Sequence, residues 1–188
     1  MDPNNFFRRT TIPMPNIDYK PIWKRGPYDT KDSIPRWIRY PKDRRIWDDE
    51  VYDKLASIGI APTLVRIFRW KPNSSFPWHV DGTVNEVTEF AINWVLEGEG
   101  IIQWDTSLVL PKPEEENYHL AYGAFEGTKE DKFDMQELGH GCLVNTTIPH
   151  RVLNLNDIHR ITVSIQFGNQ FKYNEVAEKL ISCGYINS

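Results

Sequence analysis

The sequence is poor in cysteine and has no long hydrophobic run. Its 188 residues include only two cysteines, Cys142 and Cys183, too few for a disulfide-stabilised framework. No apolar stretch approaches the roughly 18 to 20 residues of a membrane-spanning helix, and no signal-peptide core follows Met1. Cys142 lies in the apolar run Cys142-Leu143-Val144, which favours a buried thiol over a disulfide partner. We therefore expect a reduced, cytoplasmic protein that does not enter a membrane.

What the sequence does contain is typical of a folded domain. Hydrophobic residues make up 40% of the chain and aromatic residues 13%, which are values of globular proteins and not of disordered ones. The length suits one domain with a sizeable core, or one domain with an extension. The sequence shows no internal repeat.

The first 47 residues differ from the rest. They hold seven of the thirteen prolines, and eleven Lys and Arg against five Asp, whereas residues 48–188 hold eleven basic and twenty-one acidic residues. Such a segment predicts an extended arm, with a short strand at 37–40. A basic, aromatic arm could contact nucleic acid. We favour the alternative, in which the arm packs on the acidic body, buries its aromatic side chains and leaves its charges solvated.

Residues 48–188 predict a mainly β domain with a few flanking helices. Alternating apolar and polar residues predict strands, and acidic first turns followed by amphipathic periodicity predict helices. The expected strands are 63–70, a short one entering 79–81, 88–96, 101–104, 133–138, 142–145 and 160–167, and the expected helices are 48–59 and 174–181. Segments 71–75 and 97–100 are expected turns. Residues 105–132, rich in Pro, Gly and Glu, read as an insertion that could form a substrate lid.

The motif His79-Val80-Asp81-Gly82 is the first candidate for chemistry. On a strand, His79 and Asp81 leave the same face, and Gly82 permits a sharp turn after them. A further histidine, His150, follows Pro149 about seventy residues later. Two histidines and one carboxylate can hold one face of a ferrous ion and leave positions open. Taken singly, His79 could instead be a rim histidine bonded to a carboxylate, and His150 could cap a strand end.

Arg160 lies ten residues after His150, at the start of the strand 160–167. A guanidinium on the inward polar face of that strand could bind a carboxylate in bidentate fashion, and Thr162 points the same way. Pairing of Arg160 with Asp157 is the alternative. Asn93 is a polar residue in an apolar strand, where it could contact a cosubstrate or satisfy a backbone group. Arg66 could reach the same cavity or only the sheet edge.

The remaining histidines and two tryptophans are weaker candidates for site residues. His119 and His140 lie in loop sequence and should be solvated, and His159 should face away from Arg160. Trp78 and Trp94 are expected in the core.

From about Leu64 to Phe167 the sequence resembles the iron(II)- and 2-oxoglutarate-dependent dioxygenases. The resemblance consists of the H-x-D motif, a distal histidine and an arginine ten residues beyond that histidine. Within the superfamily, this pattern is similar to that of the prolyl- and aspartyl-hydroxylase branches. It implies a double-stranded β-helix, a jelly-roll or cupin-like fold. The aspartyl-hydroxylase branch has a further arginine on the strand after H-x-D, and residues 88–96 have none.

The same resemblance implies the cofactors and the roles of the site residues. His79, Asp81 and His150 would bind iron(II), and Arg160, with Thr162, would bind the far carboxylate of 2-oxoglutarate. Dioxygen would be the second cosubstrate, and ascorbate an accessory reductant. Because an aspartate stands where halogenases have a small residue, hydroxylation of a small-molecule or peptide substrate is the implied reaction.

Two other functions fit parts of the pattern. Pro149-His150 with Asn154 resembles the second motif of the cupins, which would predict a metalloprotein without 2-oxoglutarate. Cupins usually carry H-x-H and a glutamate in the first motif, however, and have no use for Arg160. The third hypothesis is a non-catalytic binding domain with the same double-stranded β-helix fold.

Overall fold

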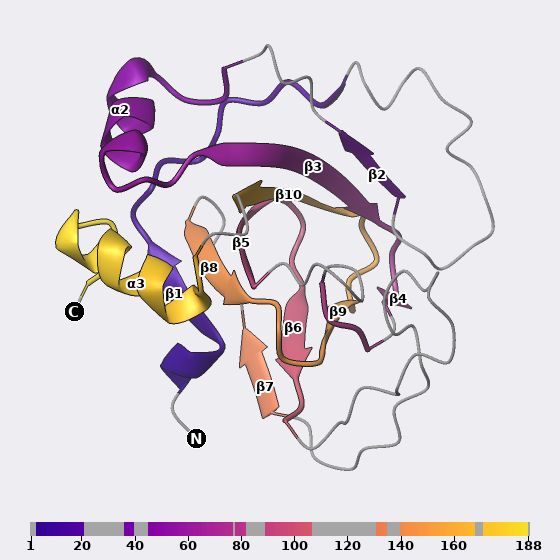
Figure 1. The fold of residues 1–188 in the computed structure, drawn as a ribbon. Coiled ribbons are helices and arrows are strands. Elements are labelled where there is room, and N and C mark those ends of the chain that lie inside the picture. The colour runs from indigo at the N-terminus through magenta and orange to yellow at the C-terminus, as the bar shows by residue number, and fades with distance from the viewer. Residues whose placement is uncertain are drawn as a thin grey trace, which may run out of the picture.

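Two antiparallel sheets, stacked face to face, dominate the computed structural model (Figure 1). It describes residues 3–20, 36–39, 45–76, 78–81, 89–106, 131–134, 140–167 and 171–187. The strands are β1 (Phe7–Thr10), β2 (Arg36–Arg39), β3 (Pro62–Trp70), β4 (Ser74–Ser75), β5 (Phe90–Glu97), β6 (Ile101–Trp104), β7 (Asp131–Asp134), β8 (Gly141–Asn145), β9 (His150–Asn154) and β10 (Arg160–Phe167). The helical elements are the short 3-10 helix η1 (Pro3–Asn5) and the α-helices α2 (Asp49–Ser57) and α3 (Tyr173–Ser182).

The order of the strands identifies a double-stranded β-helix. The larger sheet has the order β1-β8-β5-β10-β3-β2, and the smaller has the order β4-β9-β6-β7. From β3 onward the chain therefore crosses repeatedly between the two sheets, and the eight strands β3 to β10 are shared equally between them. This is the arrangement of a jelly roll. The prediction of a mainly β, double-stranded β-helix with flanking helices is confirmed.

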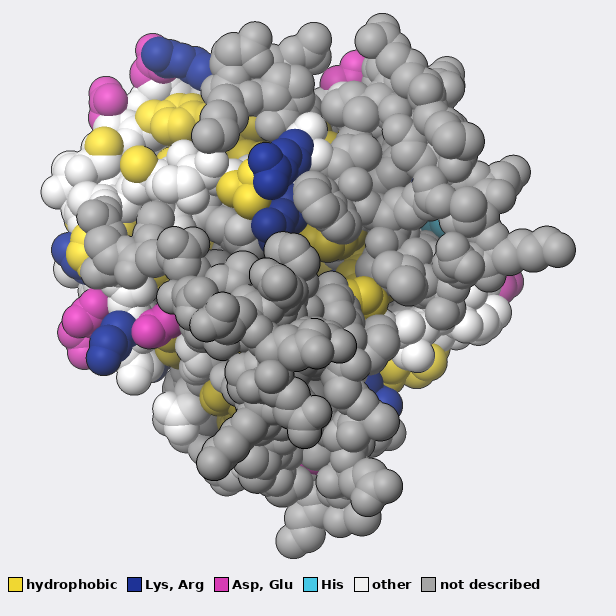
Figure 2. All heavy atoms as spheres, turned by 45° about the vertical axis from the view of Figure 1, so that its right-hand side comes forward, with side chains coloured by type: hydrophobic (Ala, Val, Ile, Leu, Met, Phe, Trp, Pro, Cys, Tyr) yellow, Lys and Arg dark blue, Asp and Glu magenta, His cyan; other side chains and the backbone are white. Residues whose placement is uncertain are grey.

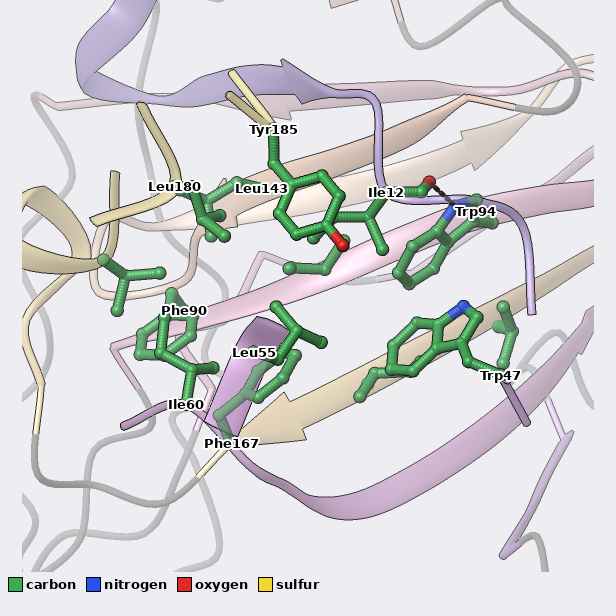
Figure 3. Close-up of a cluster of buried hydrophobic side chains, with 14 of the residues drawn as sticks. Ile12, Trp47, Leu55, Ile60, Phe90, Trp94, Leu143, Phe167, Leu180 and Tyr185 are labelled. Carbon is green, nitrogen blue, oxygen red and sulfur yellow. Dashed lines mark hydrogen bonds between the residues drawn. The ribbon is translucent and has the colours of Figure 1, made fainter. Parts of the chain in front are cut away.

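The larger hydrophobic core lies on the outer face of the larger sheet, beneath α2 and α3 (Figure 3). Ile161, Val163, Ile165 and Phe167 of β10 all belong to it, as the alternation in this strand predicts. The other face of β10, which begins with Arg160, is buried between the sheets. Strand β10 is thus covered on both sides, which fixes the direction of its polar side chains.

Both α-helices lie close to their predicted positions. Asp48 caps α2 by accepting a hydrogen bond from the Val51 N–H at 3.1 Å, and the acidic first turn favours the positive end of the helix dipole. Gly59, with φ +77°, follows the helix and adopts the left-handed conformation that ends it. In the part of the chain that the structure describes, no helix is long and apolar enough to cross a membrane.

The N-terminal arm supplies both edges of the larger sheet. Strand β2 agrees with the predicted strand to within one residue, and it pairs with β3. Strand β1 was not predicted, and it pairs with β8 along its whole length. Arg45 forms an ion pair with Asp49 of α2, and Figure 2 shows basic and acidic side chains close together at its upper left and again at its lower left.

A second core fills the space between the two sheets, and the arm reaches it. Phe6 is 1% exposed and tilts against Trp104 of β6, with ring centroids 5.9 Å apart. Phe7 stacks on the same indole, also at 5.9 Å. Asn145 ties the arm to β8, because its N–H donates to the Phe6 carbonyl at 2.8 Å. The start of the chain is therefore part of the wall of the inner core.

Replacing Phe6 with alanine should lower the free energy of unfolding by about 3–5 kcal/mol, since a fully buried phenylalanine is lost from a packed core. Denaturant unfolding followed by tryptophan fluorescence measures this difference. Met14 lies on the same arm but is 48% exposed, so Met14→Ala is the matched control and should change stability by less than about 0.5 kcal/mol. Equal stabilities of the two variants would show that the arm is not integral to the fold.

One turn prediction needs correction. Ser74 and Ser75 were expected in a turn, yet they form β4 and pair with Asn154 and Leu153 of β9. A strand was also expected at 133–138: its first two residues belong to β7, which pairs with β6, and residues 135–138 lie outside the described residues. At β4 the pairing partner decides the conformation against a local turn-like sequence. Residues 107–130, and with them the predicted lid and His119, lie outside the described residues.

The cysteines behave as expected from the sequence. Both are free thiols, and Cys142 is buried in the inner core. Burial raises the pKa of Cys142 to about 12, although the charge of Arg9 opposes the change. The thiol therefore stays protonated and unreactive at neutral pH.

Candidate metal site and anion subsite

A pair of backbone hydrogen bonds brings the H-x-D motif to the second histidine. The His79 N–H donates to the His150 carbonyl at 2.9 Å, and the His150 N–H donates to the His79 carbonyl at 2.8 Å. The Asp81 N–H then donates to the Thr146 carbonyl at 3.1 Å. Because the main chain makes these bonds, the two segments are held in register independently of their side chains.

The side chains of His79, Asp81 and His150 converge on one point. Each offers a ligand atom, and these atoms all lie within 4.8 Å of one another. The Nε2 atom of His79 lies 3.6 Å from Oδ1 of Asp81, and the two imidazole centroids are 4.3 Å apart. The histidines are buried, at 7% and 4% exposure. Two nitrogen donors and one carboxylate at these separations could hold a metal ion.

The surroundings of the histidines fix their orientation. Nδ1 of His150 lies 2.9 Å from the carbonyl oxygen of Ile148. Since a carbonyl only accepts, Nδ1 carries the proton and Nε2 presents its lone pair. The edge of Phe76 meets His79 at 4.6 Å and an interplanar angle of 88°. On β6, Trp104 is the register partner of His150.

The environment of Asp81 favours a nearby cation. Loss of water around the carboxyl group raises its pKa, and the charges of His150 and Arg66 act in the opposite direction. A carboxylate in this setting is costly without a positive charge beside it. A metal ion between Asp81 and the two histidines would supply that charge.

Arg160 is a buried cation without an acidic partner. It is 1% exposed, and its Nε atom is buried without a hydrogen-bond partner. No carboxylate of the described residues forms an ion pair with it, so the predicted alternative, pairing with Asp157, is not present. Burial alone lowers the pKa of Arg160 to about 10, and the guanidinium stays charged at neutral pH. A buried, unpaired guanidinium is the feature of this interior that most needs an anion.

The neighbours of Arg160 hold it in place. Its Cζ atom lies 5.8 Å from the ring centroid of Trp70, its register partner on β3. Gly100, just before β6, lies against the Arg160 side chain so closely that a Cβ atom there would collide with it. The indole N–H of Trp70 donates to the Thr162 hydroxyl at 3.2 Å. Arg160 and Thr162 therefore both lie next to Trp70.

A row of polar residues crosses the inner face of the larger sheet. Arg66 on β3 pairs in register with Ser164, Ser164 with Asn93, and Asn93 with Cys142. Residues directly opposite in antiparallel strands share one face, so Arg66 and Asn93 face the inner core together with Cys142. The Oδ1 atom of Asn93 is buried without a hydrogen-bond partner. Asn93 thus presents an acceptor without a partner to the inner core, and both of its predicted roles stay predictions.

The other residues singled out in the sequence do not join this site. His140 is exposed and His159 half-buried, whereas Trp94 is fully buried in the outer core, where its indole N–H donates to the Ile12 carbonyl (Figure 3). Trp78 was expected in the core but is half-buried, with Arg151 4.7 Å from its ring centroid.

Asn154 has a structural role. It is 0% exposed, and its amide donates to the carbonyls of Lys71 and Ile158 at 2.8 and 2.9 Å. It therefore joins two loops at the end of the sheets.

Sequence reasoning missed Trp70, Phe76 and Gly100. The centroid of Phe76 lies 5.9 Å from that of Trp70 and 4.6 Å from that of His79, so these two rings join the Arg160 region to the histidines. Gly100 was assigned only to a turn, although it admits the arginine side chain. The sequence signal for this contact is weak. Gly100 directly precedes β6, but its position opposite Arg160 follows only from the pairing of the strands.

Comparisons with known proteins give information about the fold but not about the function. The sequence matches no protein-family model and no curated protein. Among solved structures, the chain is similar to a cupin domain from Bordetella pertussis, with a TM-score of 0.37 and 13% identity over 58% of this chain and 94% of that one. It is also similar to a protein with a double-stranded β-helix domain from Klebsiella pneumoniae, with a TM-score of 0.36 and 12% identity over 59% and 75%.

A third similar structure is the oxalate decarboxylase of Lactobacillus farciminis, with a TM-score of 0.44 and 12% identity over 80% of this chain and 33% of that one. This chain thus spans about a third of the length of that decarboxylase. At these identities the likeness concerns the fold alone, and the double-stranded β-helix is assigned by the order of strands in its two sheets.

Proposed function

We propose that the protein is an iron(II)- and 2-oxoglutarate-dependent oxygenase that hydroxylates a small-molecule or peptide substrate. The observation that carries the proposal is Arg160, a buried guanidinium with no acidic partner among the described residues. A metalloprotein that binds only its metal would have no need of this cation. The proposal explains it as the site for the far carboxylate of the cosubstrate.

The donor set suits ferrous iron. Two imidazoles and one carboxylate on one side of an ion leave the other positions open for ligands, the pattern of the non-haem iron oxygenases. His79, Asp81 and His150 would hold the ion, and the proton on Nδ1 of His150 keeps Nε2 available to it. When bound together, iron, 2-oxoglutarate and dioxygen supply the oxidising chemistry, with succinate and carbon dioxide as the products of the cosubstrate.

The residues of the chain bind, orient and exclude water. Arg160 would take the far carboxylate through charge-assisted hydrogen bonds, and Thr162 would donate its hydroxyl to the same group. Trp70 and Phe76 fill the space beside them with apolar surface, which strengthens electrostatic interactions by keeping water away. In this proposal the cosubstrate would reach from the positive charge of Arg160 to the metal ligands.

Anaerobic titration tests the proposal. Iron(II) and 2-oxoglutarate added together to the wild-type protein should give a weak metal-to-ligand charge-transfer band in the green, and neither should give it alone. With oxygen and ascorbate, slow release of succinate should follow without any added substrate. A protein that binds iron but shows neither the band nor succinate would instead fit a cupin-type metal site.

A further inference from the structure

The polar groups around Arg160 have an unusual balance of hydrogen-bond donors and acceptors. The guanidinium has five N–H donors and no acceptor, and the Trp70 indole has one donor and no acceptor. The hydroxyl of Thr162 is the one side-chain acceptor among these three residues, and the Trp70 N–H already donates to it at 3.2 Å. After this bond Thr162 keeps its hydroxyl proton and one lone pair, and every other side-chain hydrogen-bonding group of the three residues is a donor.

We infer that Trp70 is a positioning residue of this anion subsite, and this inference rests on the proposed function. Its indole N–H holds the Thr162 oxygen, so that the single hydroxyl proton of Thr162 points to the bound carboxylate beside Arg160. Without that N–H, the hydroxyl of a strand threonine can rotate among its staggered positions. Trp70 therefore adds to carboxylate affinity without touching the carboxylate itself.

The packing of Trp70 suits it to the role of positioning Thr162. It is 5% exposed and is held on one side by the edge of Phe76, at 5.9 Å and 88°. Its register partner is Arg160, whose charge lies over the indole ring at 5.8 Å. The ring is thus confined between the residues that flank the proposed cosubstrate, and its N–H has a fixed direction.

Two keto acids separate this role from a merely structural one. 2-Oxoglutarate and 2-oxopentanoate share the keto-acid end, but the second has a methyl group in place of the far carboxylate. Trp70→Phe, loaded with cobalt(II) as an inert metal, should bind 2-oxoglutarate about tenfold more weakly, as expected for one lost hydrogen bond to a charged group. Its affinity for cobalt(II) and for 2-oxopentanoate should remain that of the wild type.

A double-mutant cycle assigns the effect to Thr162. Thr162→Val should also weaken 2-oxoglutarate about tenfold, Thr162→Ser should restore it, and Trp70→Phe should add nothing in the Thr162→Val background. Trp94→Phe is the matched control, because Trp94 also donates through its indole from a buried site but on the opposite face of the sheet. It should leave both keto acids unaffected.

The results overturn the inference in distinct ways. Equal weakening of both keto acids, or additive effects of Trp70→Phe and Thr162→Val, would mean that Trp70 acts through general packing or through Arg160. If Trp70→Phe does not fold, the indole N–H signals of the wild type decide: one should shift on binding 2-oxoglutarate, and it should not shift in Thr162→Val. No shifting indole signal would refute the role of Trp70. Failure of the wild type to bind 2-oxoglutarate at all would instead refute the proposed function.

Discussion

Replacing Asp81 with alanine should abolish iron binding. Loss of residues that only support metal ligands typically costs 10- to 100-fold in affinity, so loss of a ligand itself should cost more than about a hundredfold. Asp81 would also supply the negative charge of the triad, and the two histidines cannot replace it. Anaerobic titration with iron(II), or with cobalt(II) followed by its visible absorbance, measures the affinity.

Asp157→Ala is the control for this experiment. Asp157 is exposed and lies in the loop between β9 and β10, so its removal changes the net charge equally but should leave metal affinity at the wild-type value. Wild-type metal affinity in Asp81→Ala would show that the convergence of His79, Asp81 and His150 has no part in metal binding.

Replacing Arg160 with methionine should have two opposite effects. Affinity for 2-oxoglutarate should fall at least about a hundredfold, because two hydrogen bonds to a charged group are worth about 1.5–3 kcal/mol each. Stability without the keto acid should be unchanged or higher, since a buried charge is replaced by an apolar side chain of similar length. Calorimetric titration measures the first effect, and thermal unfolding of the metal-bound protein the second.

The sign of the stability change follows from the pKa of Arg160. Burial lowers this pKa from 12.5 to about 10, and pH 7 lies below both values. The group is therefore charged in the folded and the unfolded protein, and the full cost of its burial, on the order of 3 kcal/mol, is present at neutral pH. Methionine removes that cost.

Arg45→Met is the control, because Arg45 is exposed and paired only at the surface, so neither property should change by much. A large loss of stability in Arg160→Met, with 2-oxoglutarate affinity retained, would mean that Arg160 holds the fold together and is not part of a cosubstrate site.

The sequence allowed most of the strands to be predicted, because alternation is local information. Strand β10 begins at Arg160 and ends at Phe167, as expected, and its two faces separate as the alternation requires. Strands β1 and β4 were missed for the opposite reason. Their short segments have no alternation of their own and are strands only through bonds to β8 and β9.

The candidate site also has a part that local sequence predicts and a part that it does not. The spacing of His79 and Asp81 predicted a shared face. Their meeting with His150 rested on the order of the motifs along the chain and on the resemblance to a known family, because each histidine alone had a plain structural interpretation. The contact of Trp70 with Thr162 joins residues 92 apart in the chain. No periodicity encodes such a contact, and it became visible only with the register of β3 and β10.

The position of β1 has a consequence for the order of folding. Asn145 of β8 donates to the carbonyl of Asn5, just before β1, and the two residues are 140 apart in sequence, so docking this segment is entropically demanding and slow. The inner strands, whose partners are nearer, should pair first, and the N-terminal segment should dock onto them late. Since Phe6 and Phe7 pack on Trp104, the neighbour of His150, a refolding chain should acquire its full affinity for metal only in that last step.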